Sequence, residues 1–213
     1  MSIGPTMEGR LARLRAVDVG DAARTIAIRN TPGFELGLPP IPSDAEQQRE
    51  WIARQREAPN DYYFCVETRG TGAIEGLIGL TAVPTVSGPW SESGAWEWGR
   101  WASIASDPRL ALEGAAMLVA FAMQCDVPGV WGRVIRANTR VEAFQARLGY
   151  NLSWIAGDER YFLAEKPYLE ILHRRLGGTI PHAVGAADAP AGGVDGVRLE
   201  RMGAIDDAGR PSM

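Results

Sequence analysis

The longest apolar run in the sequence, Ala115 to Met123, most strongly limits what the chain can form. It is about half the length that a helix needs to cross a bilayer. We therefore expect a helix from about Glu113 to Gln124 that is buried in a folded domain. The chain has 213 residues, 46% of them hydrophobic, which is enough for one substantial core and too little for two comfortable domains.

Charge and cysteine content exclude several classes of function. The formal net charge is -4, and no basic stripe of the kind that binds nucleic acid is present. The first ten residues lack the apolar core of a signal peptide, so we expect a cytoplasmic protein with no membrane partner. Cys65 and Cys125 fall at no spacing typical of a disulfide framework or a metal site, and we expect buried cysteines and no metal.

The first part of the chain predicts one strand and two helices. Partial alternation in Leu11 to Val17 predicts a strand. Asp18 is a helix cap, with Asp21 in the first turn, for a helix that reaches about Ile28. Ser43 and Glu46 form the pattern S-x-x-E, which predicts a second helix to about Glu57.

Three strands are predicted next. Residues 62–68 and 74–83 are rich in branched and aromatic residues and are bounded by turn formers, and AWEWGRWASIA (95–105) is similar. Because they follow one another with no helix between them, we expect an antiparallel meander.

After the apolar helix, residues 130–137 predict a strand and residues 139–148 a helix with one apolar face. A hairpin over NLSWIA and RYFLAE and a short helix over 167–176 complete the domain. This order predicts an α/β (α+β) fold, with a mixed, mostly antiparallel sheet that is flanked by helices and splays where its parallel pair begins. We assign residues 1–9 to an N-terminal tail, 10–176 to the domain and 177–213 to a disordered tail rich in Gly, Ala, Asp and Pro.

Two segments, DPRLALEGAA (107–116) and NTRVEAFQARLGY (138–150), together with this element order, resemble the GNAT superfamily of N-acetyltransferases. The resemblance covers about residues 10 to 165. It is strongest to the branch of ribosomal-protein N-terminal and nucleotide-amino-sugar acetyltransferases. The resemblance implies a single GNAT-like domain that uses acetyl-CoA as co-substrate and needs no metal.

In this family the cofactor loop reads Q/R-x-x-G-x-G/A at a helix start, where backbone N–H groups receive the diphosphate. Here the pattern falls on residues 111–116, with Gly114 and Ala116 matching and Ala111 and Glu113 departing. The resemblance implies cofactor contacts from the following residues: Ser106, Arg109, Leu112, Glu113, Gly114, Ala115 and Ala116. From the residues alone, a buried Ala-rich helix with no ligand is an equal alternative.

The second motif has the family's spacing N-x-x-S-x-x-x-x-E-K-L-G-F. By resemblance, Asn138 contacts the pantetheine arm of the cofactor. From the residues alone, Asn138 is a residue leaving a strand into a helix, and Gly149 is a helix C-cap.

Related enzymes carry E-x-G-Y-W on the strand beside the thioester, and this chain has Glu97, Gly99 and Trp101 at the matching positions. An alkylamine with the pKa of lysine is neutral in only about one molecule in a few thousand at pH 7, a cost of about 4 to 5 kcal/mol. A carboxylate that takes the proton removes part of this barrier, which favours Glu97 as the general base. The alternative is that Glu97 is an outward charge on an alternating strand.

Other site positions follow the resemblance less closely. Many family members have a tyrosine acid where this chain has Gln145, and we expect nearby Tyr150 to be a core residue. Arg29 and Asn30 resemble an R-N pattern of the nucleotide-amino-sugar and N-terminal acetyltransferase branch, which implies a role in acceptor binding. Trp90 is a candidate to stack on a sugar or base. Arg29 as a helix-end charge is the structural alternative.

The sequence thus predicts an acetyl-CoA-dependent N-acetyltransferase acting on a small-molecule primary amine, with a nucleotide-linked amino sugar as the first candidate acceptor. A protein N-terminus is the rival acceptor. A non-catalytic GNAT-like module that binds acyl-CoA is the alternative from a different class. We expect no nucleic-acid partner and leave a homodimer open.

Overall fold

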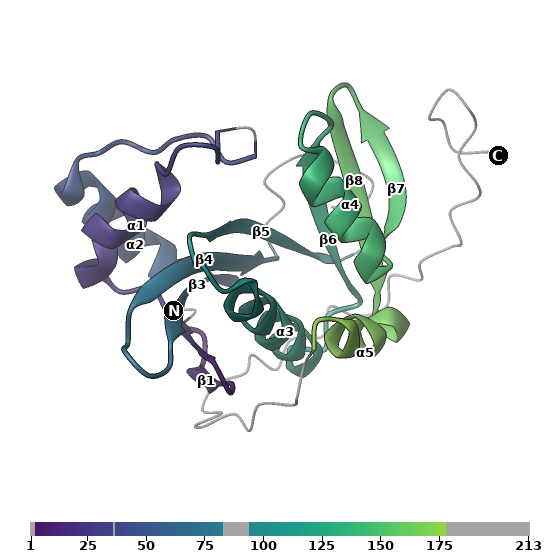
Figure 1. Cartoon of the computed structure of the whole chain (residues 1–213), viewed down its shortest axis with the longest axis horizontal. Helices are drawn as coiled ribbons and strands as arrows, with labels where there is room; N and C mark the ends of the chain where they lie inside the picture. Colours follow the sequence, from purple (N-terminus) through teal and green to yellow (C-terminus); the bar gives the residue numbers. More distant parts are fainter. Residues whose placement is uncertain (1–2, 36, 83–93, 178–213) are drawn as a thin grey trace.

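The computed structural model describes residues 3–35, 37–82 and 94–177. They form one eight-stranded sheet in the order β1-β2-β3-β4-β5-β6-β8-β7, with helices packed against it (Figure 1). All neighbouring strands are antiparallel except β5 and β6, which are parallel. The predicted α/β class and mixed, mostly antiparallel sheet are confirmed. Trp90 and the predicted tail beyond Gly177 lie outside the described residues.

The strands are β1 (Met7–Glu8), β2 (Ala12–Ala16), β3 (Asp61–Thr68), β4 (Ile74–Thr81), β5 (Trp96–Ser103), β6 (Gly129–Ile135), β7 (Asn151–Ala156) and β8 (Glu159–Glu165). The helices are a 3-10 turn η1 (Val19–Asp21), then α1 (Ala22–Arg29), α2 (Ala45–Glu57), α3 (Pro108–Gln124), α4 (Thr139–Leu148) and α5 (Lys166–Arg175). The predicted meander is β3-β4-β5, and the predicted hairpin is β7-β8.

Two local predictions need correction. Residues 7 and 8, which we assigned to the N-terminal tail, pair with β2 as β1, and Met7 is buried. The second helix is capped by Asp44 rather than Ser43, because the Asp44 carboxylate accepts hydrogen bonds from the N–H groups of Glu46 and Gln47. The cap at Asp18 is confirmed: its carboxylate and that of Asp21 form a capping box on η1.

Strand β3 is buried on both faces because helices cover both sides of the sheet. Its residues alternate between two cores: Tyr62, Phe64 and Val66 face the core that contains α3 and α5, and Tyr63 and Cys65 face the core under α1 and α2. Helix α4 lies against the β6–β8 half of the sheet (Figure 1). Both cysteines are free and buried, as expected.

The sheet opens between β5 and β6. Only two residue pairs join them, Trp96 with Val130 and Glu97 with Trp131, whereas β6 and β8 are paired along seven residues. The predicted splay at the parallel pair is therefore confirmed, and it begins directly after Glu97.

Helix α3 starts at Pro108, five residues before the predicted start at Glu113. Asp107 is its N-cap and accepts a hydrogen bond from the N–H of Arg109. Residues Ala115 to Ala122 of the apolar run are buried, as expected, and Met123 at its end is exposed. Gly114 lies in the second turn, where a Cβ atom would be 3.0 Å from both methyl carbons of Val66. The glycine lets the helix approach β3 closely.

We expect Gly114→Ala to lower the free energy of unfolding by about 1 kcal/mol. Alanine gains about 1 kcal/mol in a helix interior, but overpacking against Val66 costs about 1 to 3 kcal/mol. With Val66→Ala the clash is removed, so adding Gly114→Ala there should stabilise the protein by about 1 kcal/mol. Chemical denaturation of the four proteins measures both effects, and an equal effect in both backgrounds would contradict the packing explanation.

Candidate active site

Glu97 lies at the point where β5 and β6 diverge. It pairs with Trp131 of β6 and with Thr81 of β4, and it is 6% exposed. The absence of a side chain at Gly99 leaves room for it, since a Cβ there would be 3.2 Å from Glu97 Oε1. The alternative of an outward charge is wrong, because the carboxylate is buried beside the opening of the sheet.

Arg133 on β6 lies across the opening from Glu97. Its Nε is 3.9 Å from Glu97 Oε1, and its Nη1 donates to Glu159 Oε1 at 2.6 Å. The Tyr161 hydroxyl also donates to Glu159, and together with Arg133 it lowers the pKa of that carboxyl group. The main partner of Arg133 is thus Glu159, and its ion pair with Glu97 is longer and weaker.

The diverging strands enclose a cavity of about 230 Å³. Its walls come from β5, β6, α4 and the segment after α1, and they are lined by Arg29, Gly37, Leu38, Pro39, Glu97, Trp98, Gly99, Arg100, Trp101, Arg133, Val134, Ile135, Asn138, Val141 and Gln145. The structure therefore brings Arg29, Glu97 and Asn138 to one cavity, although Arg29 and Asn138 are 109 positions apart in the chain.

Three buried polar atoms of these lining residues have no hydrogen-bond partner among the described residues. They are two donors, Nε1 of Trp98 and Nε of Arg29, and one acceptor, Oε1 of Gln145. Unpaired buried polar atoms are costly, so unpaired donors and an acceptor on residues that line one cavity are typical of a site that receives a ligand with amide or similar groups. Gln145 stands where related enzymes have a tyrosine, and its amide cannot serve as an acid.

Asn138 caps α4 through its side chain. Its Oδ1 accepts a hydrogen bond from the N–H of Val141 at 3.3 Å, and its Nδ2 lies near Gly37, where a Cβ would be 3.2 Å away. The helix ends at Gly149, whose φ of 84° is the left-handed cap conformation. Both structural explanations from sequence are confirmed, and Asn138 also lines the cavity.

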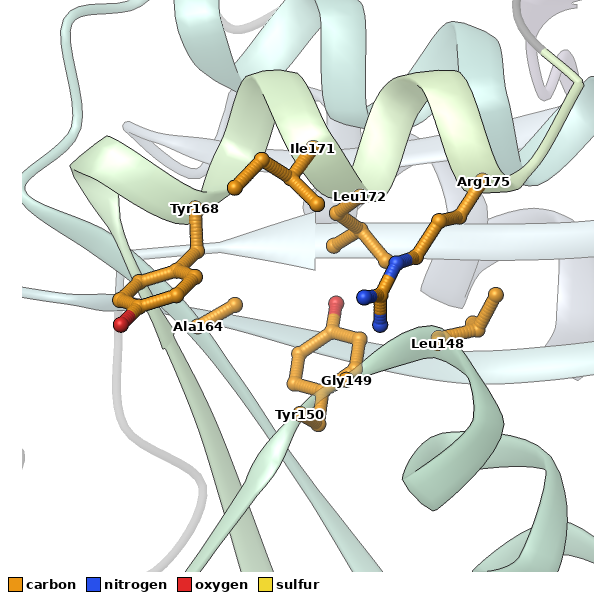
Figure 2. A pocket seen from close by; sticks show the side chains of 8 residues that line it. All are labelled: Leu148, Gly149, Tyr150, Ala164, Tyr168, Ile171, Leu172 and Arg175. Carbon is orange, nitrogen blue, oxygen red and sulfur yellow. The ribbon is translucent and has the colours of Figure 1, made fainter.

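Tyr150 belongs to the main core, as expected. Figure 2 shows its hydroxyl directed toward α5, into a separate cavity of about 140 Å³ that Leu172 and Arg175 also line. Burial raises the pKa of the Tyr150 phenol well above its usual value. Tyr150 is therefore poorly placed to give a proton to a group beside Glu97.

The N–H groups of α3 that have no carbonyl partner inside the helix belong to its first turn and not to residues 112–116. Pro108 has no N–H, and the N–H groups of Arg109 and Leu110 donate to the carboxylate and the carbonyl of Asp107. Ser106 is exposed just before the helix, and Arg109 forms an ion pair with Asp107, with Nη2 2.7 Å from Oδ2. An acidic N-cap therefore stands where an anionic ligand would meet the positive end of the helix.

Glu113 and the residues after it have structural roles that account for their identity. The Glu113 carboxylate accepts hydrogen bonds from the N–H groups of Arg10, Leu11 and Ala12 at 2.6 to 2.7 Å. Gly114, Ala115 and Ala116 are buried within the helix, and Leu112 is half-buried against the same core. Helix geometry does not support the cofactor contacts that we expected from residues 112–116.

Arg29 and Asn30 end helix α1. Arg29 Nη2 donates to the carbonyl of Pro39 at 3.0 Å. The Asn30 amide both donates to and accepts from the backbone of Ile41, so it holds the loop after α1 and has little capacity left for a substrate. Of the three predicted acceptor residues, Arg29 alone is placed at the cavity, since Trp90 is outside the described residues.

Arg100, Arg133 and Trp98 were missed in the sequence analysis. Arg100 occupies a bulge in β5 with a φ of 53°, pairs with Asp61 and lies over the ring of Tyr63 at 5.0 Å. The signal that could have found Arg133 is an arginine inside the otherwise apolar strand VWGRVI. No sequence pattern indicates where the two strands part.

The model of the GNAT acetyltransferase domain family matches residues 12–151. The chain belongs to this family, and it is an N-acetyltransferase by class. A comparison with curated proteins finds no match. In the described residues no helix is long and apolar enough to cross a membrane, and no group of three or more His, Cys, Asp and Glu could hold a metal ion.

Solved structures with the same fold include the apo form of FdhC, described as a nucleotide-linked sugar GNAT, at 20% identity and a TM-score of 0.65, covering 81% of this chain and 98% of that one. A probable acetyltransferase from Chromobacterium violaceum has 17% identity and a TM-score of 0.63, over 80% and 96%. The ribosomal-protein-S5-alanine acetyltransferase from Vibrio fischeri has 14% identity and a TM-score of 0.55, over 75% and 94%.

GNAT domains use acetyl-CoA, and the residues present fit one part of it. The unpaired Trp98 Nε1 and Gln145 Oε1 suit the amide-bearing pantetheine arm. At the start of α3, where the resemblance implies the diphosphate, the Asp107 carboxylate would oppose the charge of such a ligand.

We expect Asp107→Ser to tighten acetyl-CoA binding by about fivefold. Serine caps a helix nearly as well as aspartate, so the variant removes one negative charge and keeps the helix start. Calorimetric titration with acetyl-CoA measures the dissociation constant.

The control is Asp44→Ser, the same exchange at the N-cap of α2, which should leave acetyl-CoA affinity unchanged. Equal affinity in wild type and Asp107→Ser would show that the start of α3 does not hold the phosphates.

Proposed function

We propose that this protein transfers an acetyl group from acetyl-CoA to a primary amine, with Glu97 as the general base. The observation that carries the proposal is the position of Glu97: a buried carboxylate at the vertex of two diverging strands, in the wall of a cavity of about 230 Å³. An amine in this cavity would have one carboxylate to accept its proton.

The residues around Glu97 have separable roles in this proposal. Acetyl-CoA supplies the activated thioester. Trp98 Nε1 and Gln145 Oε1 bind and orient the amide groups of the pantetheine arm, with Asn138 beside them. Ser106 and Arg109 remain candidates for contact with the phosphates. The Glu97 carboxylate, with Nε of Arg133 3.9 Å from its Oε1, takes the proton from the ammonium form of the acceptor.

For the acceptor we propose a nucleotide-linked amino sugar first and a protein N-terminus second. Solved structures described as a nucleotide-linked sugar GNAT and as a ribosomal-protein-S5-alanine acetyltransferase share the fold. Their sequence identities to this chain, 20% and 14%, are too low to indicate its substrate. Arg29 in the lining of the cavity favours an acceptor that carries negative charge.

Glu97→Gln should lower kcat by about 100-fold to 10,000-fold and leave acetyl-CoA affinity unchanged, because the amide fills the same space but accepts no proton. Thiol release and calorimetry measure the two quantities. The matched control is Glu75→Gln on the neighbouring strand β4, a residue outside the cavity, which should keep wild-type activity.

Two results would contradict the proposal. Binding of acetyl-CoA with no release of thiol, in wild type and in Glu97→Gln alike, would favour the non-catalytic module. Absence of acetyl-CoA binding would remove the enzyme role altogether.

A panel of acceptors separates the two candidate substrates. Thiol release is expected with nucleotide amino sugars and not with short peptides. Turnover of peptides alone would overturn the sugar proposal and leave the transfer reaction standing.

A further inference from the structure

A second cavity, of about 270 Å³, lies between helices α1 and α2 and strand β3. It is lined by Arg29, Ile41, Pro42, Gln47, Gln48, Trp51, Arg54 and Tyr63. None of the reactions derived above uses it.

Two buried donors in its lining have no hydrogen-bond partner among the described residues. They are the hydroxyl of Tyr63, a residue that is 3% exposed, and Nε of Arg29. Burial raises the pKa of the Tyr63 phenol, and the neighbouring Arg29 guanidinium opposes this only in part, so the phenol stays protonated and can donate at neutral pH. The two groups are thus neighbours, but no hydrogen bond of good geometry joins them. Each unsatisfied donor has a cost, which an acceptor oxygen in the cavity would relieve.

The charge around these donors is positive. The lining includes two arginines and no acidic residue, although Arg54 has an exposed contact with Glu50 at 3.7 Å. A third guanidinium, that of Arg100, lies 5.0 Å from the centre of the Tyr63 ring. Arg100 is paired with Asp61, but Nε of Arg29 has no such partner. Arginine with a neutral donor beside it is a typical arrangement for binding a carboxylate or phosphate group.

The position of Arg29 connects this cavity to the one that holds Glu97. Arg29 lines both cavities, so its side chain forms a common wall. Trp51 closes the side of the second cavity, with its ring edge-on to Tyr63 at 5.7 Å between centroids. A molecule that reaches past Arg29 would have one end at Glu97 and the other at Tyr63.

We propose that the cavity between α1, α2 and β3 binds an anionic oxygen group, carboxylate or phosphate, of the amine that is acetylated. The substrate class is then an amine that carries an oxyanion. This rests on the transfer reaction proposed above, and the binding experiment below uses a readout that does not need that reaction.

The binding experiment follows the melting temperature of the full chain in inorganic phosphate and, separately, in acetate, with sodium chloride at equal ionic strength as reference. Phosphate at about 100 times its dissociation constant should raise the melting temperature by about 5 °C or more. A response to acetate alone would assign the site to carboxylates, and a response to phosphate to phosphate esters.

Two variants test where the anion sits. Tyr63→Phe removes a hydroxyl that has no partner, so it should not destabilise the anion-free protein, yet it should reduce the stabilisation by anions. Arg29→Gln should abolish it. The matched control is Arg24→Gln, an exposed arginine of the same helix, which should respond to anions as wild type does. Stabilisation that survives both test variants comes from another site and overturns the proposal.

The kinetic experiment compares acceptor pairs that differ only in the anionic group: an amine with and without a phosphate ester, and an amino acid and its decarboxylated amine. Arg29→Gln should raise KM for the anionic member by about 10-fold to 100-fold and leave the neutral member unchanged. Equal effects on both members would overturn the proposal. If instead wild type releases no thiol with any of these acceptors while Tyr63→Phe loses the response to anions, the proposed reaction fails and the anion site remains.

Discussion

The short junction between β5 and β6 determines the position of every group in the candidate active site. The two strands are paired at only two residue positions, so beyond these positions they form no hydrogen bonds with each other. The backbone and side chains there border an opening in the sheet. Glu97 occupies the last joined position, and Trp98 to Trp101 on one side and Arg133 to Ile135 on the other form the walls.

Much of the fold could be predicted because its signals are local. Strand alternation, the apolar helix and the left-handed cap at Gly149 each depend on residues close together in sequence. The misplaced features depended on competition between neighbours. Ser43 and Asp44 are both good capping residues, so the sequence alone does not decide between them, and in the structure Asp44 is the cap. Helix α3 starts at Pro108, five residues before the predicted start, because Asp107 caps it there. Strand β1 was missed because two residues carry no periodicity.

The site was predictable only in part, for a different reason. Glu97 and Asn138 were found through motif spacing, and the structure places both at one cavity. Gly114 also matched the cofactor-loop pattern and Glu113 departed from it, but the identities of both are explained by packing against β3 and by hydrogen bonds from the N–H groups of residues 10–12. The roles of Arg133, Arg100 and Tyr63 could be recognised only in the structure. They depend on contacts between strands that are distant in sequence and not on neighbouring residues in the chain.

The Glu113 carboxylate holds three successive N–H groups of residues 10–12, across separations of 101 to 103 residues. During synthesis from the amino end, the backbone that leads into β2 cannot be satisfied in this way until more than half of the chain has been made. The edge of the sheet that is translated first is thus completed late. Until then, the order of assembly leaves β2 dependent on solvent or on β3 for its hydrogen bonds, so the earliest residues of this protein are among the last to reach their final environment.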